Sequence, residues 1–315
     1  MGLAYGKTAY VNGEKITGLF VPRDSLKIEE YVEYTPDMES TYSLSSSVSG
    51  YTSNQTINQD TSLKWQILSI NNDGTIDLIS NKQTDQLISF IGALGYNNCV
   101  YILNDICAKQ YSNKELGVTA RSINLEDDIE PKMNEEGILA RNSYGKGETY
   151  AYGNVMTYKN KTYTYYPSLY AQEKGSGIDT GTARKDGLEN NEWSSPISEK
   201  FKQAKNSLTA TSNEYVMSGS ETPKYFDDSN FYNLIFGTDF NYWLASRCVF
   251  CSASSAYFYL RRISNNEITD NILAFSAGTE NDTRENYLRI IVPLNNEVQI
   301  YGGDGSEERP YQLTK

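Results

Sequence analysis

The 315-residue sequence contains no histidine. Histidine is the side chain that most often serves as a general base or a zinc ligand near neutral pH. Its absence lowers the expectation of hydrolytic or metal chemistry. The sequence also lacks a phosphate-binding Walker motif, a dinucleotide-binding fingerprint and a nucleophile elbow. We therefore expect a protein that is not an enzyme and that uses neither a metal nor a cofactor.

Basic residues are in the minority, with 28 lysines and arginines against 40 acidic residues and a net charge of −12. Binding to nucleic acid requires a basic face, so nucleic acid is not an expected partner. No apolar run approaches the roughly 20 residues that span a bilayer. Residues 1–7 lack the basic start and apolar stretch of a secretory signal. We expect neither membrane insertion nor export by the usual route.

Cysteine is also scarce, with four residues at Cys99, Cys107, Cys248 and Cys251. Cys248 and Cys251 have one half of a zinc-knuckle spacing, but Cys99 and Cys107 do not have the other half. No βαβ pattern surrounds the Cys-x-x-Cys pair, so a redox role is also weakly supported. One disulfide, or none, is the expected state.

Tyrosine, in contrast, is abundant, with 26 residues. Its ring gives a large rigid face with a polar tip, and binding surfaces favour it for that reason. Tyrosine is also common in half-buried strands, so both interpretations stay open for any single residue.

The N-terminal part contains two hairpin signals. Asn12-Gly13 separates two β-prone runs and predicts a tight turn. We interpret residues 1–25 as a short attachment segment and residues 26–315 as one domain. Within that domain, two apolar runs at 63–70 and 75–80 flank an Asn-Asn-Asp-Gly turn and predict a hairpin inside a sheet.

Three segments have helical patterns. Residues 97–111 place Val100, Leu103, Ile106 and Cys107 on one face. Residues 125–133 follow Asn124 as a cap and contain Pro131, and residues 230–236 follow a cap at Asp228 or Ser229. A short helix at 198–206 and a strand at 214–217 are also expected. The acidic clusters 126–128 and 307–308 are interpreted as solvated side chains.

The last third is predicted to be rich in strands, at 242–246, 256–261 and 288–294, with polar connections at 263–271 and 276–286. In strand 256–261, alternation places Tyr257, Tyr259 and Arg261 on one face. This face suits an exposed recognition sheet, and the alternative is an ordinary amphipathic edge strand. The alternation predicts buried and exposed sets: Trp243, Leu244, Phe258, Leu260, Ile290 and Val292 in the core, and Arg247, Phe250, Tyr257 and Tyr259 on one exposed face.

Several stretches together resemble a domain family of gram-positive gut bacteria and their phages. The matching stretches are 63–70 with Asp73-Gly74, 95–98, 103–107, 120–124, 231–234, 242–247 and the ending 303–306. The C-terminal pattern of tryptophan strand, irregular loop and strand is similar to the C-type-lectin-fold variable proteins of diversity-generating retroelements. The resemblance implies an α+β fold: a C-type-lectin-like domain with long irregular loops after a short N-terminal β-hairpin segment.

The resemblance also implies a function, a non-catalytic ligand-binding protein of the phage receptor-binding or adhesin type, with a diversified recognition surface in residues 243–290. Its expected ligand is a cell-surface protein or glycan. The residues implied to bind that ligand are Arg247, Cys248, Phe250, Ser252, Ser254, Tyr257, Tyr259, Arg262, Asn265, Asn266, Asp270 and Asn271.

Residues 6–18 resemble the start of some phage tail-associated proteins. This implies a virion or extracellular location, with homo-oligomers or phage tail proteins as partners of the N-terminal segment. The alternative is a bacterial cell-surface or pilus-associated structural protein. A less favoured alternative is a cysteine-dependent oxidase of the sulfatase-activating type, which shares the broad fold.

The resemblance has one further implication, for cysteine. In C-type-lectin domains the first helix packs beside the C-terminal sheet, which implies that Cys107 lies close to Cys251. A disulfide between them and a pair of free thiols are both compatible with this arrangement.

Overall fold

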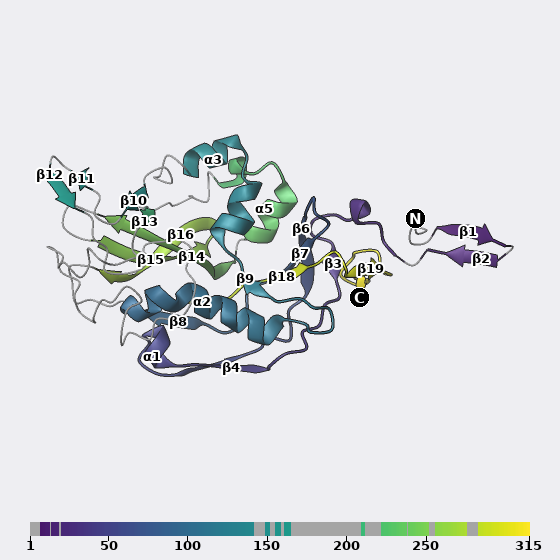
Figure 1. Cartoon of the computed structure of the whole chain (residues 1–315), viewed down its shortest axis with the longest axis horizontal. Helices are drawn as coiled ribbons and strands as arrows, with labels where there is room; N and C mark the ends of the chain where they lie inside the picture. Colours follow the sequence, from purple (N-terminus) through teal and green to yellow (C-terminus); the bar gives the residue numbers. More distant parts are fainter. Residues whose placement is uncertain are drawn as a thin grey trace.

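The computed structural model of this chain has a mixed α+β fold, as expected (Figure 1). It describes residues 7–12, 14–18, 20–141, 149–151, 155–158, 161–164, 209–211, 222–237, 239–251, 256–275 and 283–315. The helix predicted at 198–206 and the strand predicted at 214–217 lie outside these residues.

The first of two main sheets has five antiparallel strands in the order β3-β6-β7-β18-β9. The predicted hairpin is confirmed as its centre, with β6 (Trp65–Ile70) and β7 (Ile76–Ser80) joined by a turn at Gly74. Strand β18 (Ile290–Leu294) lies between β7 and β9, so the C-terminal part of the chain completes a sheet begun near the N-terminus. The outer strands are β3 (Tyr31–Val32) and β9 (Arg121–Ser122).

The second sheet has three antiparallel strands, β14 (Asn241–Cys251), β15 (Ala256–Ser264) and β16 (Glu267–Phe275). The polar connection predicted at 263–271 is wrong, because most of it belongs to a β-hairpin. Asn265 and Asn266 have φ values of 49° and 67° and form its two-residue turn. Asparagine tolerates this left-handed conformation, and the directly paired Ile263 and Ile268 are fully buried beside the turn.

The predicted helix at 97–111 is confirmed within α2 (Gly92–Tyr111), and its four predicted inward residues are all buried. Residues 125–133 form a π-helical turn, η2 (Leu125–Ile129), and a 3₁₀ turn, η3 (Glu130–Lys132), instead of one helix. Asn124 caps the first of these turns, as predicted, by accepting a hydrogen bond from Asp127 N at 2.7 Å. Asp128 is a buried residue of the same turn.

Short elements complete the described part of the chain. The carboxylate of Asp228 caps α5 (Ser229–Ile235), as predicted. The others are η1 (Arg23–Ser25), β4 (Thr41–Leu44), α1 (Ser46–Ser49), β5 (Gln55–Asn58), β8 (Ile88–Ile91), α3 (Glu135–Arg141), β10 (Thr149–Ala151), β11 (Val155–Tyr158), β12 (Lys161–Thr164), β13 (Thr209–Thr211), η5 (Thr222–Tyr225), β17 (Thr283–Asn286), β19 (Gln299–Tyr301) and β20 (Gln312–Thr314).

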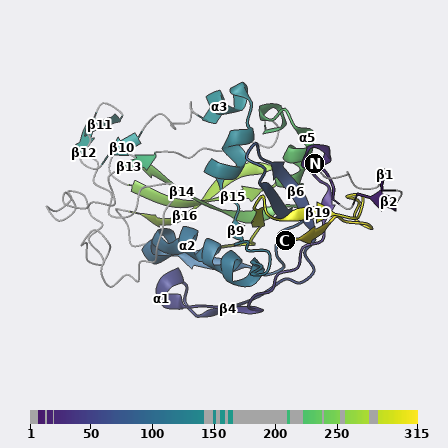
Figure 2. The same ribbon diagram turned by 45° about the vertical axis from the view of Figure 1, so that its right-hand side comes forward.

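Both main sheets are buried on both faces. In β14, Trp243 and Ala245 join the core that includes α2, whereas Tyr242 and Leu244 join the core that includes α5. Strand side chains alternate between faces, so consecutive apolar residues supply two cores at once. Figures 1 and 2 show α2 on one side of the β14–β16 sheet and α5 on the other.

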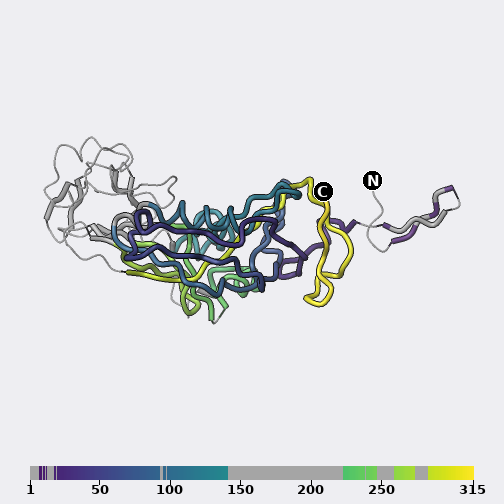
Figure 3. Tube along the Cα trace, turned by 90° about the horizontal axis from the view of Figure 1, so that it is seen from below, coloured from purple at the N-terminus to yellow at the C-terminus, as the bar shows by residue number. Residues whose placement is uncertain are grey.

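The predicted N-terminal hairpin is confirmed as β1 (Thr8–Val11) and β2 (Glu14–Thr17), with Val11 paired to Glu14 across the turn. It projects beyond the rest of the molecule at the end where the C-terminus lies (Figure 3). The chain joins the body at Phe20, which forms a bridge with Tyr301. No helix among the described residues is long and apolar enough to cross a membrane.

The C-terminal loop 302–311 folds back onto β3. Tyr31 N donates to Gly305 O at 2.8 Å, and Tyr311 N donates to Tyr31 O at 2.9 Å. Gly303 has a φ of +61°, and a Cβ there would overlap the backbone carbonyl of Pro310. Only glycine allows both this conformation and this close approach.

We predict that Gly303→Ala destabilises the protein more than Gly302→Ala does. Both positions have positive φ, so each alanine carries left-handed strain of about 1–2 kcal/mol. Only position 303 adds overlap with a backbone atom, for a further loss of about 1–3 kcal/mol. Urea unfolding measures both variants, and equal losses would contradict the fold-back of the loop.

Candidate functional site

The β14–β16 sheet contains most of the segment predicted to bind a ligand. The sheet lies toward the end of the molecule opposite both chain termini (Figures 1 and 3). Its hairpin turn at 265–266 lies at one end of the strands, and the paired positions Cys251 and Ala256 lie at the other. These two ends are called the turn end and the distal end.

Residues 242–246 of β14, near the turn end, form a buried segment that we call the root of the sheet. Tyr242, Trp243, Leu244, Ala245 and Ser246 are each at most 1% exposed. The predicted core residues Trp243, Leu244, Leu260, Ile290 and Val292 are confirmed, since each is 0% exposed. The side chain of Phe258 lies outside the described part of the chain.

The exposed tyrosine–arginine face predicted for β15 is wrong at Tyr259 and Arg261, which are 8% and 0% exposed. The prediction assumed that one face of an alternating strand meets solvent. Strand β15 is instead the central strand, with β14 and β16 on its sides and a core on each face. Arg261 and Tyr259 therefore belong to the scaffold of the sheet.

The other predicted ligand residues fall into two groups. Those near the turn end are exposed or partly exposed: Arg262, Asn265, Asn266, Asp270 and Asn271. The group toward the distal end contains Arg247, Cys248, Phe250 and Tyr257. The structure describes the strand positions of these four residues but not their side chains. Ser252 and Ser254 lie outside the described residues.

The structure brings the inner members of these two groups near each other and keeps the outer members apart. Arg247 and Asn271 both pair with Leu260, so only the width of β15 separates their strand positions. Tyr257 and Asn265 are separated by most of the length of β15, which is roughly 26 Å at about 3.3 Å per strand residue. A ligand that contacts the outer members of both groups must be larger than a monosaccharide, as a protein or an extended glycan is.

An interruption in strand pairing shapes the root. Trp243 pairs with Arg262 and Arg247 pairs with Leu260, so residues 244–246 oppose only Arg261. Such bulges bend a strand and release its backbone groups from the ladder. Here the segment that precedes and begins η2 accepts a hydrogen bond from one of the released backbone groups of β14, Ala245 N, and also contacts the Ser246 side chain.

We call these contacts the β14 clamp. Ala245 N donates to Ile123 O at 2.8 Å, and Leu125 N donates to Ser246 Oγ at 2.8 Å. Ser246 Oγ in turn donates to a carboxylate oxygen of Glu126 at 2.6 Å. The clamp joins the root of the second sheet to the segment that leaves the first sheet at β9.

An ion pair between the buried Asp128 and the partly exposed Arg121 supports the clamp. Both carboxylate oxygens of Asp128 accept from the Arg121 guanidinium, at 2.6 and 2.5 Å, and one also accepts from Asn124 N at 2.8 Å. Burial raises the pKa of Asp128, and the Arg121 contact opposes that rise. The interpretation of residues 126–128 as solvated is thus wrong for Asp128, which is 6% exposed.

Arg289 is fully buried, as Arg261 is, although the sequence alone indicated only a strand residue at this position. Its Nε donates to Ser80 O at 3.0 Å, and its guanidinium carbon lies 4.1 Å from the ring centroid of Phe240. Burial lowers the pKa of Arg289 and raises that of the neighbouring Tyr242 to about 12. The sequence around Arg289 does not indicate these contacts, because Ser80 and Phe240 are distant from it in the chain.

Of the two states left open for Cys107, the structure has the free thiol and not the disulfide. The side chain of Cys251 lies outside the described part of the chain. Cys107 is fully buried on the inward face of α2, where it packs as a small apolar group. Burial raises the pKa of the Cys107 thiol well above its usual range. Among the residues that the structure describes, no three potential metal ligands of the cysteine or carboxylate type gather in one place.

Comparison with family models, with curated proteins and with solved structures finds no match for this chain.

We predict that Asp128→Asn destabilises the protein by about 1–3 kcal/mol, because it removes the charge-assisted hydrogen bonds between the Arg121 guanidinium and a buried carboxylate. The matched control is Asp127→Asn in the same turn, where the side chain is exposed and a change within about 0.5 kcal/mol is expected. Thermal and urea unfolding measure both variants. Similar small effects at both positions would show that the ion pair does not support the clamp.

We also predict that Cys99 and Cys107 resist alkylation in the folded protein, since both are 0% exposed. Treatment with iodoacetamide before and after denaturation, followed by peptide mass spectrometry, measures this. Both residues are expected to be modified only after unfolding. A disulfide-linked peptide containing Cys107 under non-reducing conditions would contradict the structure.

Proposed function

We propose that this chain is a non-catalytic ligand-binding protein of the receptor-binding or adhesin type, with its recognition surface on the β14–β16 sheet. The observation that carries the proposal is the contrast within this sheet. Its root is buried on both faces and held by the β14 clamp, while the sheet continues toward the end of the molecule opposite the termini.

A fixed root favours binding because it holds the backbone in place before the ligand arrives. Side chains on such a backbone lose less conformational entropy on binding than side chains on a mobile loop. The same support lets surface residues vary without loss of the fold, since Trp243, Leu260 and Arg261 take part in the core and not in the surface. This is the property that a diversified recognition surface needs.

We also propose that the α+β fold is of the C-type-lectin kind. Three features support this assignment: the side-by-side N- and C-terminal segments, the insertion of β18 between β7 and β9, and the separate sheet of β14–β16 packed on α2. Val32 forms a bridge with Tyr311, which ties the two ends of the domain together. The assignment is a proposal about fold class, and fold class alone does not set function.

The proposed ligand is a cell-surface protein or an extended glycan, because the outermost predicted contact residues, such as Tyr257 and Asn265, are far apart along β15. The opposite end of the molecule bears the β1–β2 hairpin, which projects from the body (Figure 3). An isolated two-stranded hairpin is only marginally stable in water, so a partner is expected to cover it. Phage tail proteins or further copies of this chain suit that role on a virion.

The hairpin also favours the second candidate, a bacterial cell-surface or pilus-associated protein, since it would serve equally as an anchor there. Neighbouring genes for tail proteins and a reverse transcriptase, or for prepilins, separate the two. An oxidase based on Cys248 and Cys251 is less favoured, because both lie within strand β14 and not at a helix N-terminus, where reactive cysteines of this spacing occur.

We predict that the double variant Arg247→Ala/Tyr257→Ala reduces adsorption of the protein to cells of a gram-positive gut host by at least tenfold. Such residue types dominate the binding energy of interfaces, and each truncation at a hot spot costs about 2 kcal/mol or more. Fluorescently labelled full-length protein and a panel of host isolates provide the measurement.

The matched control is Tyr10→Ala, which removes a tyrosine that is 73% exposed on the attachment hairpin. It should leave adsorption of the isolated protein unchanged. Equal adsorption by the double variant and the unmodified protein, with unchanged melting temperatures, would contradict the assignment of recognition to this sheet.

A further inference from the structure

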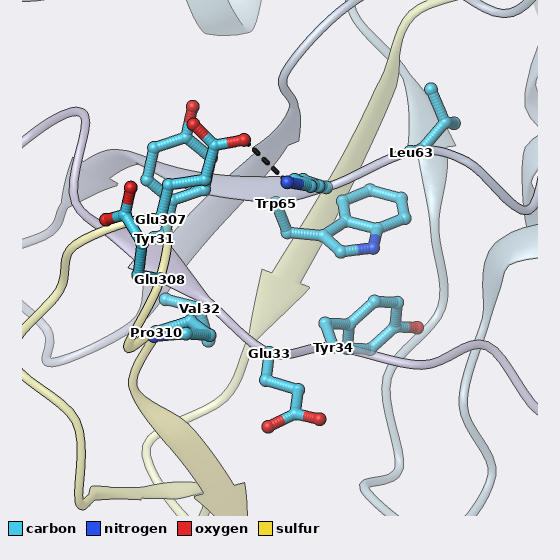
Figure 4. Close-up of a pocket in the computed structure, with 10 residues that line it drawn as sticks. Tyr31, Val32, Glu33, Tyr34, Leu63, Trp65, Glu307, Glu308 and Pro310 are labelled. Atoms are coloured by element: carbon cyan, nitrogen blue, oxygen red, sulfur yellow. Dashed lines mark hydrogen bonds and ion pairs between the residues drawn. The ribbon is translucent and has the colours of Figure 1, made fainter.

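A pocket lies at the end of the molecule that bears the termini. It has a volume of about 390 Å³ and lies between β3, the start of β6 and the C-terminal loop (Figure 4). The residues that line it are Tyr31, Val32, Glu33, Tyr34, Leu63, Lys64, Trp65, Glu307, Glu308 and Pro310.

The floor of the pocket is apolar and rigid. Val32, Tyr34 and Trp65 are 2%, 5% and 3% exposed, and the rings of Tyr34 and Trp65 pack edge to face with centroids 5.0 Å apart. The Tyr34 hydroxyl donates to Tyr111 O at 2.6 Å and is therefore used inside the protein. Partly exposed side chains of Tyr31, Leu63 and Pro310 extend the apolar wall toward solvent.

The rim of the pocket is acidic. It carries three carboxylates, Glu33, Glu307 and Glu308, against one cation, Lys64. Lys64 and Glu307 form an ion pair at 2.5 Å, which leaves the charges of Glu33 and Glu308 without a cation in the pocket. Burial, followed by the charge of Glu307, raises the pKa of Tyr31 on the same rim.

The rim is held in place by backbone contacts. Glu33 N donates to Tyr311 O at 2.7 Å, beside the contacts of Tyr31 with the C-terminal loop described above. The loop itself is closed by Asp304 N donating to Arg309 O at 2.9 Å. These bonds hold the backbones at Glu33 and in the C-terminal loop beside one pocket. The exposed carboxylates of Glu33 and Glu308 lie on opposite sides of Val32 and Pro310 and point away from each other (Figure 4).

From this arrangement we propose that the pocket binds a cation carried on a short apolar stem, namely a primary ammonium group. The charge lies at the acidic rim formed by Glu33, Glu307 and Glu308, and the stem lies along the apolar wall of the pocket. Aromatic rings attract cations through their faces and accept aliphatic stems by contact, so one wall suits both parts of the ligand.

This site is separate from the proposed recognition sheet and goes beyond the proposed function. The pocket lies beside the point where the N-terminal segment joins the body of the molecule, because Val21 N donates to Ile300 O at 2.8 Å next to the C-terminal loop. Two sources of the cation have the required chemistry, a lysine side chain of a partner protein and an amino sugar. The experiment separates them.

The test is calorimetric titration of the full chain with two pairs of probes. One pair is Nα-acetyl-lysine methylamide and its Nε-acetylated form, and the other is glucosamine and N-acetylglucosamine. We expect saturable binding of at least one cationic probe and at least tenfold weaker binding of its neutral partner. Binding of the lysine probe alone identifies a peptide side chain, and binding of glucosamine alone identifies an amino sugar.

The variant Glu33→Gln/Glu308→Gln removes both carboxylates from the exposed rim and should weaken binding at least tenfold with an unchanged melting temperature. The matched control is Glu135→Gln, at an exposed position of α3, and it should bind as the unmodified protein does. The proposal is overturned if no cationic probe saturates, if neutral probes bind equally well, or if the double variant keeps full affinity.

Discussion

The interruption of strand pairing at residues 244–246 is the constraint on which the rest of the structure depends. Three residues of β14 oppose one residue of β15, and their backbone groups need partners elsewhere. Through the β14 clamp, the segment 123–126 supplies a partner for Ala245 N and two partners for the Ser246 hydroxyl. Because that segment directly follows β9, the clamp fixes the second sheet to the first. The Arg121–Asp128 pair then holds the segment itself in position.

The two-sided burial of both sheets follows from this junction. Strands that alternate between two cores need apolar residues at consecutive positions, as in 242–245 and 290–292. The same arrangement explains why charged residues such as Arg261 and Arg289 are enclosed, since each lies on or next to a strand with a core on both faces. Function is then expected where the enclosure ends: on the sheet away from its root, and in the pocket between β3 and the C-terminal loop.

Sequence reasoning predicted the elements whose signals are local. The Asn12 and Gly74 turns, helix α2 and the Asp228 cap each depend on a few neighbouring residues, and each is confirmed. It failed where partners are distant in sequence. The burial of Tyr259 depends on the cores that lie on both faces of its sheet. The role of Asp128 depends on Arg121, seven residues earlier, and the intervening residues do not form a continuous helix that would predict the contact. The pocket joins residues 31–34 to 307–310, and no local pattern in either segment indicates it.

Hydrogen exchange of the root tests the central claim most directly. If the β14 clamp makes the root of the recognition sheet part of the global core, the amides of residues 242–246 exchange only through complete unfolding. The intact chain is exchanged and then digested, and mass spectrometry of the peptides measures the protection of each segment. The protection of residues 242–246 then equals that of residues 100–107 in α2. Exchange at 242–246 that is faster than in α2 by tenfold or more would show that the root opens on its own, and it would contradict the account of a fixed scaffold for recognition.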